Sequence, residues 1–117
     1  MTKAIVCGGR DFEDYEGLSG VLDKIVKLYQ VTAIVQGGAR GADMLARRWA
    51  LENGFPLEQY DEECSTYGKS AGPIRNQQML EESGATVVIA FPGGNGTYDM
   101  IKRARRAEGV ELIHITE

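Results

Sequence analysis

The chain has 117 residues, enough for one domain with a single hydrophobic core. With 43% hydrophobic and 26% charged residues, its composition is that of an ordinary globular protein. The net charge of −4 and the pI of about 5.0 argue against a nucleic-acid-binding surface, which normally carries a basic excess. No apolar run approaches the roughly 20 residues of a membrane span, and the N-terminus turns polar too early for a signal peptide. We therefore expect a cytoplasmic protein in which Cys7 and Cys64 are reduced thiols.

Strands and helices alternate along the chain. Short apolar runs followed by glycine, or by a polar turn, predict five strands at residues 3–7, 32–36, 56–60, 86–90 and 110–115. Apolar residues at helical spacing predict four helices, at residues 18–29, 42–50, 74–83 and 98–107. The longest loop is polar and covers residues 61–72. Asn53-Gly54, Gly84 and Gly109 are typical helix stops.

Alternation of this kind predicts an α/β fold, a Rossmann-like three-layer sandwich with helices on both faces of a parallel sheet. The expected strand order is 3-2-1-4-5, within a single domain that spans residues 1–117. In that order the winding direction reverses between the first and fourth strands. Ligands of open α/β sheets bind at this reversal, outside the carboxyl ends of the strands.

Three strands end in a pair of glycines, and we call these turns the glycine corners. The pairs are Gly8-Gly9, Gly37-Gly38 and Gly93-Gly94. In a parallel sheet the three corners lie on one edge, where backbone N–H groups and helix N-termini favour an anion, above all a phosphate. A tight turn from strand to helix also favours glycine for its own sake, but three corners flanked by Arg10, Arg40 and Arg75 favour a phosphate-bearing ligand.

The corner with the clearest pattern is 91–99, FPGGNGTYD. Glycines without a Cβ let the backbone turn sharply and let a ligand come close. Thr97 either caps the following helix or reaches a phosphate oxygen with its hydroxyl. The Walker A pattern and the GxGxxG fingerprint are both absent, and the second strand lacks the acidic residue that would hold a ribose in a dehydrogenase. We therefore predict no nicotinamide cofactor, and the sequence indicates no metal site.

Four ordered motifs resemble the YspA/YpsA-related branch of the SLOG superfamily, which also contains the LOG phosphoribohydrolases and the DNA-processing protein DprA. They are GGRDF at 8–12, GGARGAD at 37–43, GKSAGPIRNQQML at 68–80 and FPGGNGTYDM at 91–100. The resemblance implies a Rossmann-like domain that binds a nucleotide or a nucleotide-derived molecule in a bacterial or phage protein. Relatives of the LOG type are often dimers, so the resemblance also leaves a homo-oligomer open.

The LOG enzymes carry PGGxGTxxE, with a catalytic Glu, and an Arg on the preceding helix. Here Met100 stands in the place of that Glu, and the nearest acid is Asp99, one position earlier. Arg75 resembles the helical Arg. A carboxylate at the start of a helix also complements the helix dipole, so Asp99 has two interpretations: a helix cap, or a ligand-contacting or catalytic group.

Several other polar residues have two interpretations. Asp43 can cap its helix or contact a ribose, Lys69 can close over a ligand or remain solvated, and Arg40 can clamp a phosphate or remain exposed. The residues expected to bind the ligand are Gly8, Gly9, Arg10, Asp11, Gly37, Gly38, Ala39, Arg40, Gly41, Asp43, Lys69, Arg75, Asn76, Gly93, Gly94, Asn95, Gly96 and Thr97.

The first functional hypothesis is a module that senses or sequesters a nucleotide-like small molecule. The alternative is a LOG-like phosphoribohydrolase, in which Arg75 holds the substrate and Asp99 stabilises the charge that develops as the N-glycosidic bond breaks. A third hypothesis, DNA binding in the manner of DprA, is disfavoured by the acidic balance of the chain.

Overall fold

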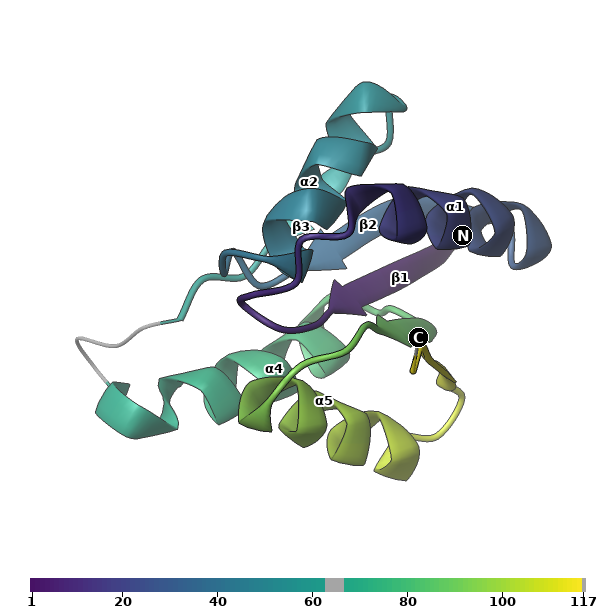
Figure 1. Cartoon of the computed structure of the whole chain (residues 1–117). Helices are drawn as coiled ribbons and strands as arrows, with labels where there is room; N and C mark the ends of the chain where they lie inside the picture. Colours follow the sequence, from purple (N-terminus) through teal and green to yellow (C-terminus); the bar gives the residue numbers. More distant parts are fainter. Residues whose placement is uncertain (63–66, 117) are drawn as a thin grey trace.

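The computed structural model describes residues 1–62 and 67–116, so Cys64 lies outside the described residues (Figure 1). The elements in chain order are β1 (Thr2–Cys7), α1 (Tyr15–Leu28), β2 (Val31–Gln36), α2 (Ala42–Glu52), β3 (Leu57–Gln59), the 3-10 helix η1 (Gly68–Ser70), α4 (Ala71–Glu82), β4 (Val87–Ala90), α5 (Asn95–Arg106) and β5 (Glu111–His114). All five expected strands are present, with ends that differ from the prediction by no more than one residue each.

The five strands form one sheet in the order β3-β2-β1-β4-β5, and every pairing is parallel. This confirms the predicted α/β class, the Rossmann-like fold and the strand order. Ile5 lies opposite Val35 on one side and Val88 on the other, so the three central strands are in step. Their carboxyl ends, and the glycine corners that follow them, therefore lie at one edge of the sheet.

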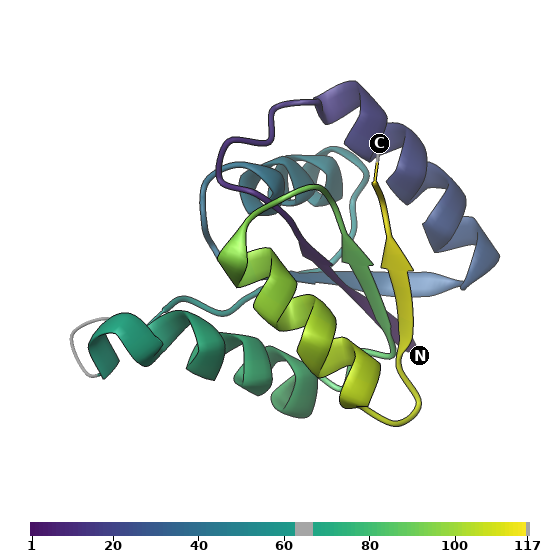
Figure 2. The ribbon, with the colours of Figure 1, turned by 60° about the horizontal axis from the view of Figure 1, so that its bottom comes forward.

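The helices cover both faces of the sheet. Figures 1 and 2 show α1 and α2 on one face and α4 and α5, side by side, on the other. Residues of β1 alternate between the two layers: Ala4 and Val6 pack with Leu18, Leu22 and Trp49 under α1 and α2. Ile5 and Cys7 pack with Met79, Met100 and Ile101 under α4 and α5. Burial on both faces explains why the central strands read as continuous apolar runs.

Three helices begin earlier than their apolar spacing predicts. α1 begins at Tyr15 because the Asp14 carboxylate caps it, accepting a hydrogen bond of 2.9 Å from the Gly17 N–H. α4 begins at Ala71, inside the expected loop, and α5 begins at Asn95. The prediction was wrong at these ends because the first turns are rich in glycine and polar residues, whose low helix propensity is overridden by tertiary contacts.

The earlier starts change the position of three candidate residues. Arg75 is the fifth residue of α4 instead of lying at its start, and Asp99 is the fifth residue of α5. Thr97 is the third residue of α5 and makes no capping hydrogen bond, so the capping interpretations of Thr97 and Asp99 are wrong. None of the helices in the described part of the chain combines the length and the apolar character needed to cross a membrane.

Candidate binding site

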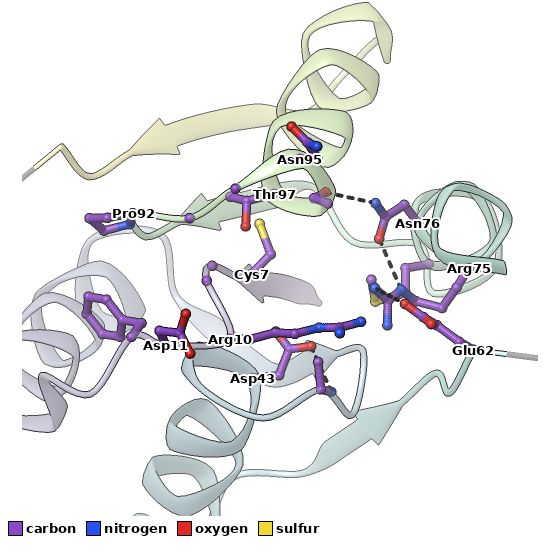
Figure 3. A pocket seen from close by; sticks show the side chains of 18 residues that line it. Cys7, Arg10, Asp11, Asp43, Glu62, Arg75, Asn76, Pro92, Asn95 and Thr97 are labelled. Carbon is purple, nitrogen blue, oxygen red and sulfur yellow. Dashed lines mark hydrogen bonds and ion pairs between the residues drawn. The ribbon is translucent and has the colours of Figure 1, made fainter. Parts of the chain in front are cut away.

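A cavity of about 640 Å³ opens at the carboxyl edge of the sheet, and we call it the main cavity. This volume lies within the roughly 300–1,000 Å³ typical of small-molecule sites. Figure 3 shows side chains from several elements converging on it. Its lining includes thirteen of the expected ligand-binding residues: Gly8, Gly9, Arg10, Asp11, Ala39, Asp43, Arg75, Asn76, Gly93, Gly94, Asn95, Gly96 and Thr97. The structure thus brings together turns that lie far apart in the sequence.

A smaller cavity of about 410 Å³ adjoins the main cavity, and we call it the side cavity. The two share Arg10, Ala39, Glu62 and Arg75. Gly37, Gly38 and Arg40 line the side cavity only. Gly41, Lys69 and Asp99 line neither of the two cavities. Gly41 instead fills a structural position, with φ +82° and its Cα against the backbone of Gly9 and Arg10.

The N-terminus of α5 is open toward the main cavity. Its N-cap is Gly94, which has no side chain to accept a hydrogen bond, and the first turn contains no acidic residue. The first intrahelical bond runs from the Tyr98 N–H to the Gly94 carbonyl, at 2.9 Å. The N–H groups before Tyr98 therefore have no intrahelical acceptor, and together with the helix dipole they favour an anion.

Thr97 adds a side-chain donor to the same corner. The residue is only 7% exposed and lines the main cavity, yet its hydroxyl makes no hydrogen bond with any described residue. The hydroxyl oxygen is nevertheless reached by solvent from the cavity, since every fully buried side-chain nitrogen and oxygen atom of the described residues has a hydrogen-bond partner. Figure 3 shows the hydroxyl directed into the cavity. The first turn of α5 and Thr97 together form a site with several hydrogen-bond donors and no carboxylate.

Gly93 lets the first and third glycine corners meet. The Gly9 N–H donates a 2.9 Å hydrogen bond to the Pro92 carbonyl, which ties the turn after β1 to the turn after β4. A Cβ on Gly93 would lie 2.6 Å from the Gly9 nitrogen and would also collide with the Thr97 hydroxyl. Only glycine fits at this contact, because a side chain at position 93 would displace both the Gly9 backbone and the Thr97 side chain.

The second glycine corner differs from the third, because its amides are already occupied. The Gly38 N–H donates to the Gln36 side chain, the Ala39 N–H donates to the Asp43 carboxylate at 3.1 Å, and the Ala42 N–H donates to the Gly9 carbonyl at 3.1 Å. The expectation that all three corners offer their amides to an anion is therefore wrong. A polar side chain folded back onto this turn satisfies the N–H groups that a ligand would otherwise need.

Asp43 brings a buried carboxyl to the main cavity. It is 5% exposed and lies in the first turn of α2. Burial raises the pKa of Asp43 to about 6, against the opposing effects of the Ala39 N–H and the Arg75 charge. Burial and the Asp43 charge raise the pKa of the neighbouring Cys7 thiol to about 12, so that Cys7 stays a neutral, unreactive part of the cavity wall at neutral pH.

The Arg75 guanidinium reaches across from α4 and is held by three groups. It donates to the Gly37 carbonyl at 2.7 Å and to the Asn76 side-chain oxygen at 3.0 Å, and it pairs with the Glu62 carboxylate at 3.5 Å. A Cβ on Gly37 would collide with this guanidinium, which explains the need for glycine at that position. Arg75 therefore lines both cavities as an anchored, largely neutralised cation.

Asp99 does not line the main cavity. Its carboxylate accepts hydrogen bonds from the Asn76 side-chain nitrogen at 2.9 Å and from Arg103 Nε at 2.8 Å. Burial raises the pKa of Asp99, but these hydrogen bonds and the charge of Arg103 outweigh it and lower the pKa below its ordinary value. Met100, at the position of the LOG catalytic Glu, is fully buried in the core.

Five further residues line the main cavity without having been predicted: Cys7, Phe12, Glu62, Met79 and Pro92. The Phe12 ring packs on Phe91 with a centroid distance of 5.3 Å, so it forms a fixed apolar wall. Phe12 directly follows the Gly-Gly-Arg-Asp turn. An aromatic residue next to an expected ligand-binding turn was the sequence feature that could have identified it as part of the site. Glu62 had no such signal in the sequence, because its ion pair with Arg75 joins two residues that are placed together by the fold.

The sequence pattern of the YspA, cpYpsA-related SLOG family matches residues 2–67, more than half of the chain. This protein belongs to that SLOG family. The Gene 61 protein of Mycobacterium phage D29 is 34% identical over 122 aligned positions, which cover 97% of this chain and 96% of the phage protein. The family match spans the first two glycine corners, and the alignment with the phage protein extends over nearly the whole chain. The predicted membership in the YspA-related branch of the SLOG superfamily is thereby confirmed.

Proposed function

We propose that this SLOG protein binds a nucleotide or a nucleotide-derived molecule in the main cavity, with a phosphate group at the N-terminus of α5. The observation that carries the proposal is the open first turn of α5, where uncapped N–H groups lie beside the unpaired hydroxyl of Thr97. Membership in the SLOG family is consistent with such a ligand.

Arg10 is suited to hold the phosphate from the opposite side. No ion pair joins its guanidinium to another described residue, and it lines both cavities. Figure 3 draws Arg10 extending into the main cavity, across from Thr97. A guanidinium without a carboxylate partner can form charge-assisted hydrogen bonds with a phosphate and lose no existing ion pair.

The remaining wall suits the rest of a nucleotide. Phe12 and Pro92 offer an apolar surface to the flat face of a base, and the anchored Phe12 ring loses little freedom on stacking. Asp43 lies in the same cavity, where its carboxyl group can meet a hydroxyl or a phosphate oxygen of the ligand. A phosphate site beside an apolar wall and hydroxyl-binding groups favours a nucleotide over inorganic phosphate.

The position of Asp99 favours binding over hydrolysis. LOG-like cleavage of an N-glycosidic bond needs a carboxylate at the sugar, but Asp99 is engaged by Asn76 and Arg103 outside the lining of the main cavity. Incubation with AMP, followed by chromatography for free adenine, tests this choice. Release of adenine that depends on Asp99 would favour the LOG-like alternative.

Isothermal titration calorimetry with AMP, ADP-ribose and 3′,5′-cyclic AMP tests the proposal, with adenosine as the ligand that lacks phosphate. We expect binding of at least one phosphate-bearing ligand and much weaker binding of adenosine. Thr97→Val keeps the shape of the side chain and removes the donor, so it should weaken binding by about 1.5 kcal/mol, or roughly tenfold.

Thr86→Val is the matched control, because Thr86 is exposed and does not line the main cavity. This variant should bind as the wild type does. Equal affinity for AMP and adenosine, or no heat with any of the three phosphate-bearing ligands, would contradict the proposal.

A further inference from the structure

We propose that Asp43 contacts the bound ligand as a neutral carboxylic acid, so that ligand binding takes up a proton near neutral pH. This inference rests on the proposed function, since it requires a phosphate in the main cavity. It assigns to Asp43 a role as hydrogen-bond donor. An ionised Asp43 that caps its helix or contacts a ribose would only accept hydrogen bonds.

The first step of the argument is that Asp43 shares one enclosed space with the anion site. Asp43, Thr97 and the first turn of α5 all line the main cavity. Asp43 itself is 5% exposed, so solvent screens its charge poorly. A phosphate at α5 and an ionised carboxylate would then be two negative charges in the same poorly screened cavity, an arrangement that favours protonation of one of them.

The second step is that the Arg75 charge offsets the Asp43 charge only in part, and no unpaired cation remains among the described residues of the cavity lining once a phosphate is bound. The charged and titratable groups that line the cavity around it are Cys7 on β1, Arg10 and Asp11 after β1, Glu62 after β3 and Arg75 on α4. Cys7 stays neutral, and Arg75 is held by Gly37, Asn76 and Glu62. Arg10 is the remaining cation, and a bound phosphate would engage it.

The third step is that Asp43 of the unliganded protein is already close to the pH at which its carboxyl takes up a proton. Burial places the pKa of Asp43 at about 6 before any ligand enters, so the carboxyl is mostly ionised at pH 7. A phosphate nearby raises this pKa further, because the ionised form is repelled and the neutral form can donate to a phosphate oxygen. Binding at pH 7 therefore converts Asp43 from the ionised to the neutral form.

Calorimetry with ADP-ribose provides the test, because the phosphates of a diphosphate diester lack the ionisation near pH 6 of a phosphate monoester. Titrations at pH 7 in PIPES and in Tris, whose heats of ionisation differ, give the number of protons taken up. We expect an uptake approaching one proton per ligand, and an affinity that falls up to tenfold per pH unit between the free and bound pKa values of Asp43.

Asp43→Asn should abolish the proton uptake, make the affinity independent of pH and bind more tightly than the wild type at pH 8. Asp11→Asn is the matched control: Asp11 lines the same cavity, but its side chain is 95% exposed, so proton uptake should persist. If Asp43→Asn does not fold, a carboxyl-carbon NMR titration of the wild type, with and without saturating ADP-ribose, reads the same pKa change directly.

The outcomes separate this inference from the proposed function. Binding of ADP-ribose without proton uptake, or uptake that survives in Asp43→Asn, overturns only the role of Asp43. If ADP-ribose does not bind but AMP does, the test uses AMP and compares the proton uptake of the wild type with that of Asp43→Asn. The phosphate of AMP changes its own protonation equally in both titrations, so the difference between them belongs to Asp43. If only 3′,5′-cyclic AMP binds, it replaces ADP-ribose in the same test, since its phosphate is also a diester. If none of ADP-ribose, AMP and 3′,5′-cyclic AMP binds, the proposed function and this inference fall together.

Discussion

The side-chain nitrogen of Asn76 donates a hydrogen bond of 2.9 Å to the carboxylate of Asp99, and this contact joins α4 to α5. The same nitrogen also donates to the Gly96 carbonyl at 3.2 Å, in the first turn of α5. Asn76 is 3% exposed, so these bonds are shielded from water. The acid nearest to the LOG catalytic position is thus part of the packing between two helices.

Asp99→Asn tests this structural role. The change removes the ion pair with Arg103 and should lower the free energy of unfolding by about 0.5–1 kcal/mol, since the pair is partly exposed. Because the folded-state pKa of Asp99 is lowered, its contribution is present at neutral pH and is lost as the pH falls through that pKa. Urea denaturation at pH 7 and at pH 3 measures both effects.

Ligand affinity of Asp99→Asn should remain within about twofold of the wild type, because Asp99 does not line the main cavity. Arg103→Gln should be destabilising to a similar degree, and the double variant should be less than additive. A large loss of affinity in Asp99→Asn with unchanged stability would instead place Asp99 at the ligand.

Gly93→Ala and Gly96→Ala should have opposite effects on stability. A Cβ at Gly93 collides with Gly9 and Thr97, whereas a Cβ at Gly96 meets no atom within 4 Å. Gly96 lies within α5, where alanine is favoured over glycine by roughly 0.5–1 kcal/mol. Overpacking should lower the free energy of unfolding of Gly93→Ala by about 1–3 kcal/mol. In thermal unfolding, Gly93→Ala should therefore have a lower midpoint temperature than the wild type, and Gly96→Ala a higher one. Equal midpoints for the two variants would contradict the close contact between the corners.

Asp43→Asn should stabilise the unliganded protein at neutral pH. The folded-state pKa of about 6 lies above the ordinary 3.8, so the native state binds more protons between these values and stability falls as the pH rises through that window. Above about pH 6 the buried charge costs roughly 1–3 kcal/mol, which asparagine avoids while keeping an oxygen for the Ala39 N–H.

Denaturation of wild type and Asp43→Asn at pH 4 and pH 7.5 checks this prediction. The gain from the substitution should appear at pH 7.5 and disappear at pH 4. A variant that is less stable than the wild type at both values would indicate that the ionised carboxylate is a favourable part of the fold.

Arg10→Gln and Arg40→Gln separate a ligand-binding arginine from a surface one. Arg10 lines both cavities, whereas Arg40 lines the side cavity and pairs with the exposed Asp11 at 3.3 Å. Arg10→Gln should weaken binding of AMP by about 1.5 kcal/mol, or roughly tenfold, and reduce its dependence on salt. Arg40→Gln should have a much smaller effect. Calorimetry at two salt concentrations gives the answer, and equal losses in both variants would move the phosphate toward the side cavity.

Sequence reasoning was accurate where local pattern decides the structure. The run of buried residues in β4 and the glycines that follow it predicted a strand, a turn and a helix in that order. It was inaccurate for the first turn of α5, because the contact between Gly93 and Gly9 that shapes this turn joins positions far apart in the chain. Helix propensity depends only on the local sequence, so the prediction placed Asn95, Gly96 and Thr97 in a loop.

Taken alone, the amino-acid sequence determined the order of strands and helices, the parallel sheet and the edge on which the glycine corners lie, because periodicity and glycine placement are local properties. Tertiary structure decided which corner is open. Gln36 and Asp43 fold back onto the second corner, and Asn76 binds the Asp99 carboxylate outside the lining of the main cavity. Those outcomes depend on hydrogen bonds that the fold creates between side chains and backbone groups from different elements, and a buried donor takes whichever acceptor lies within reach.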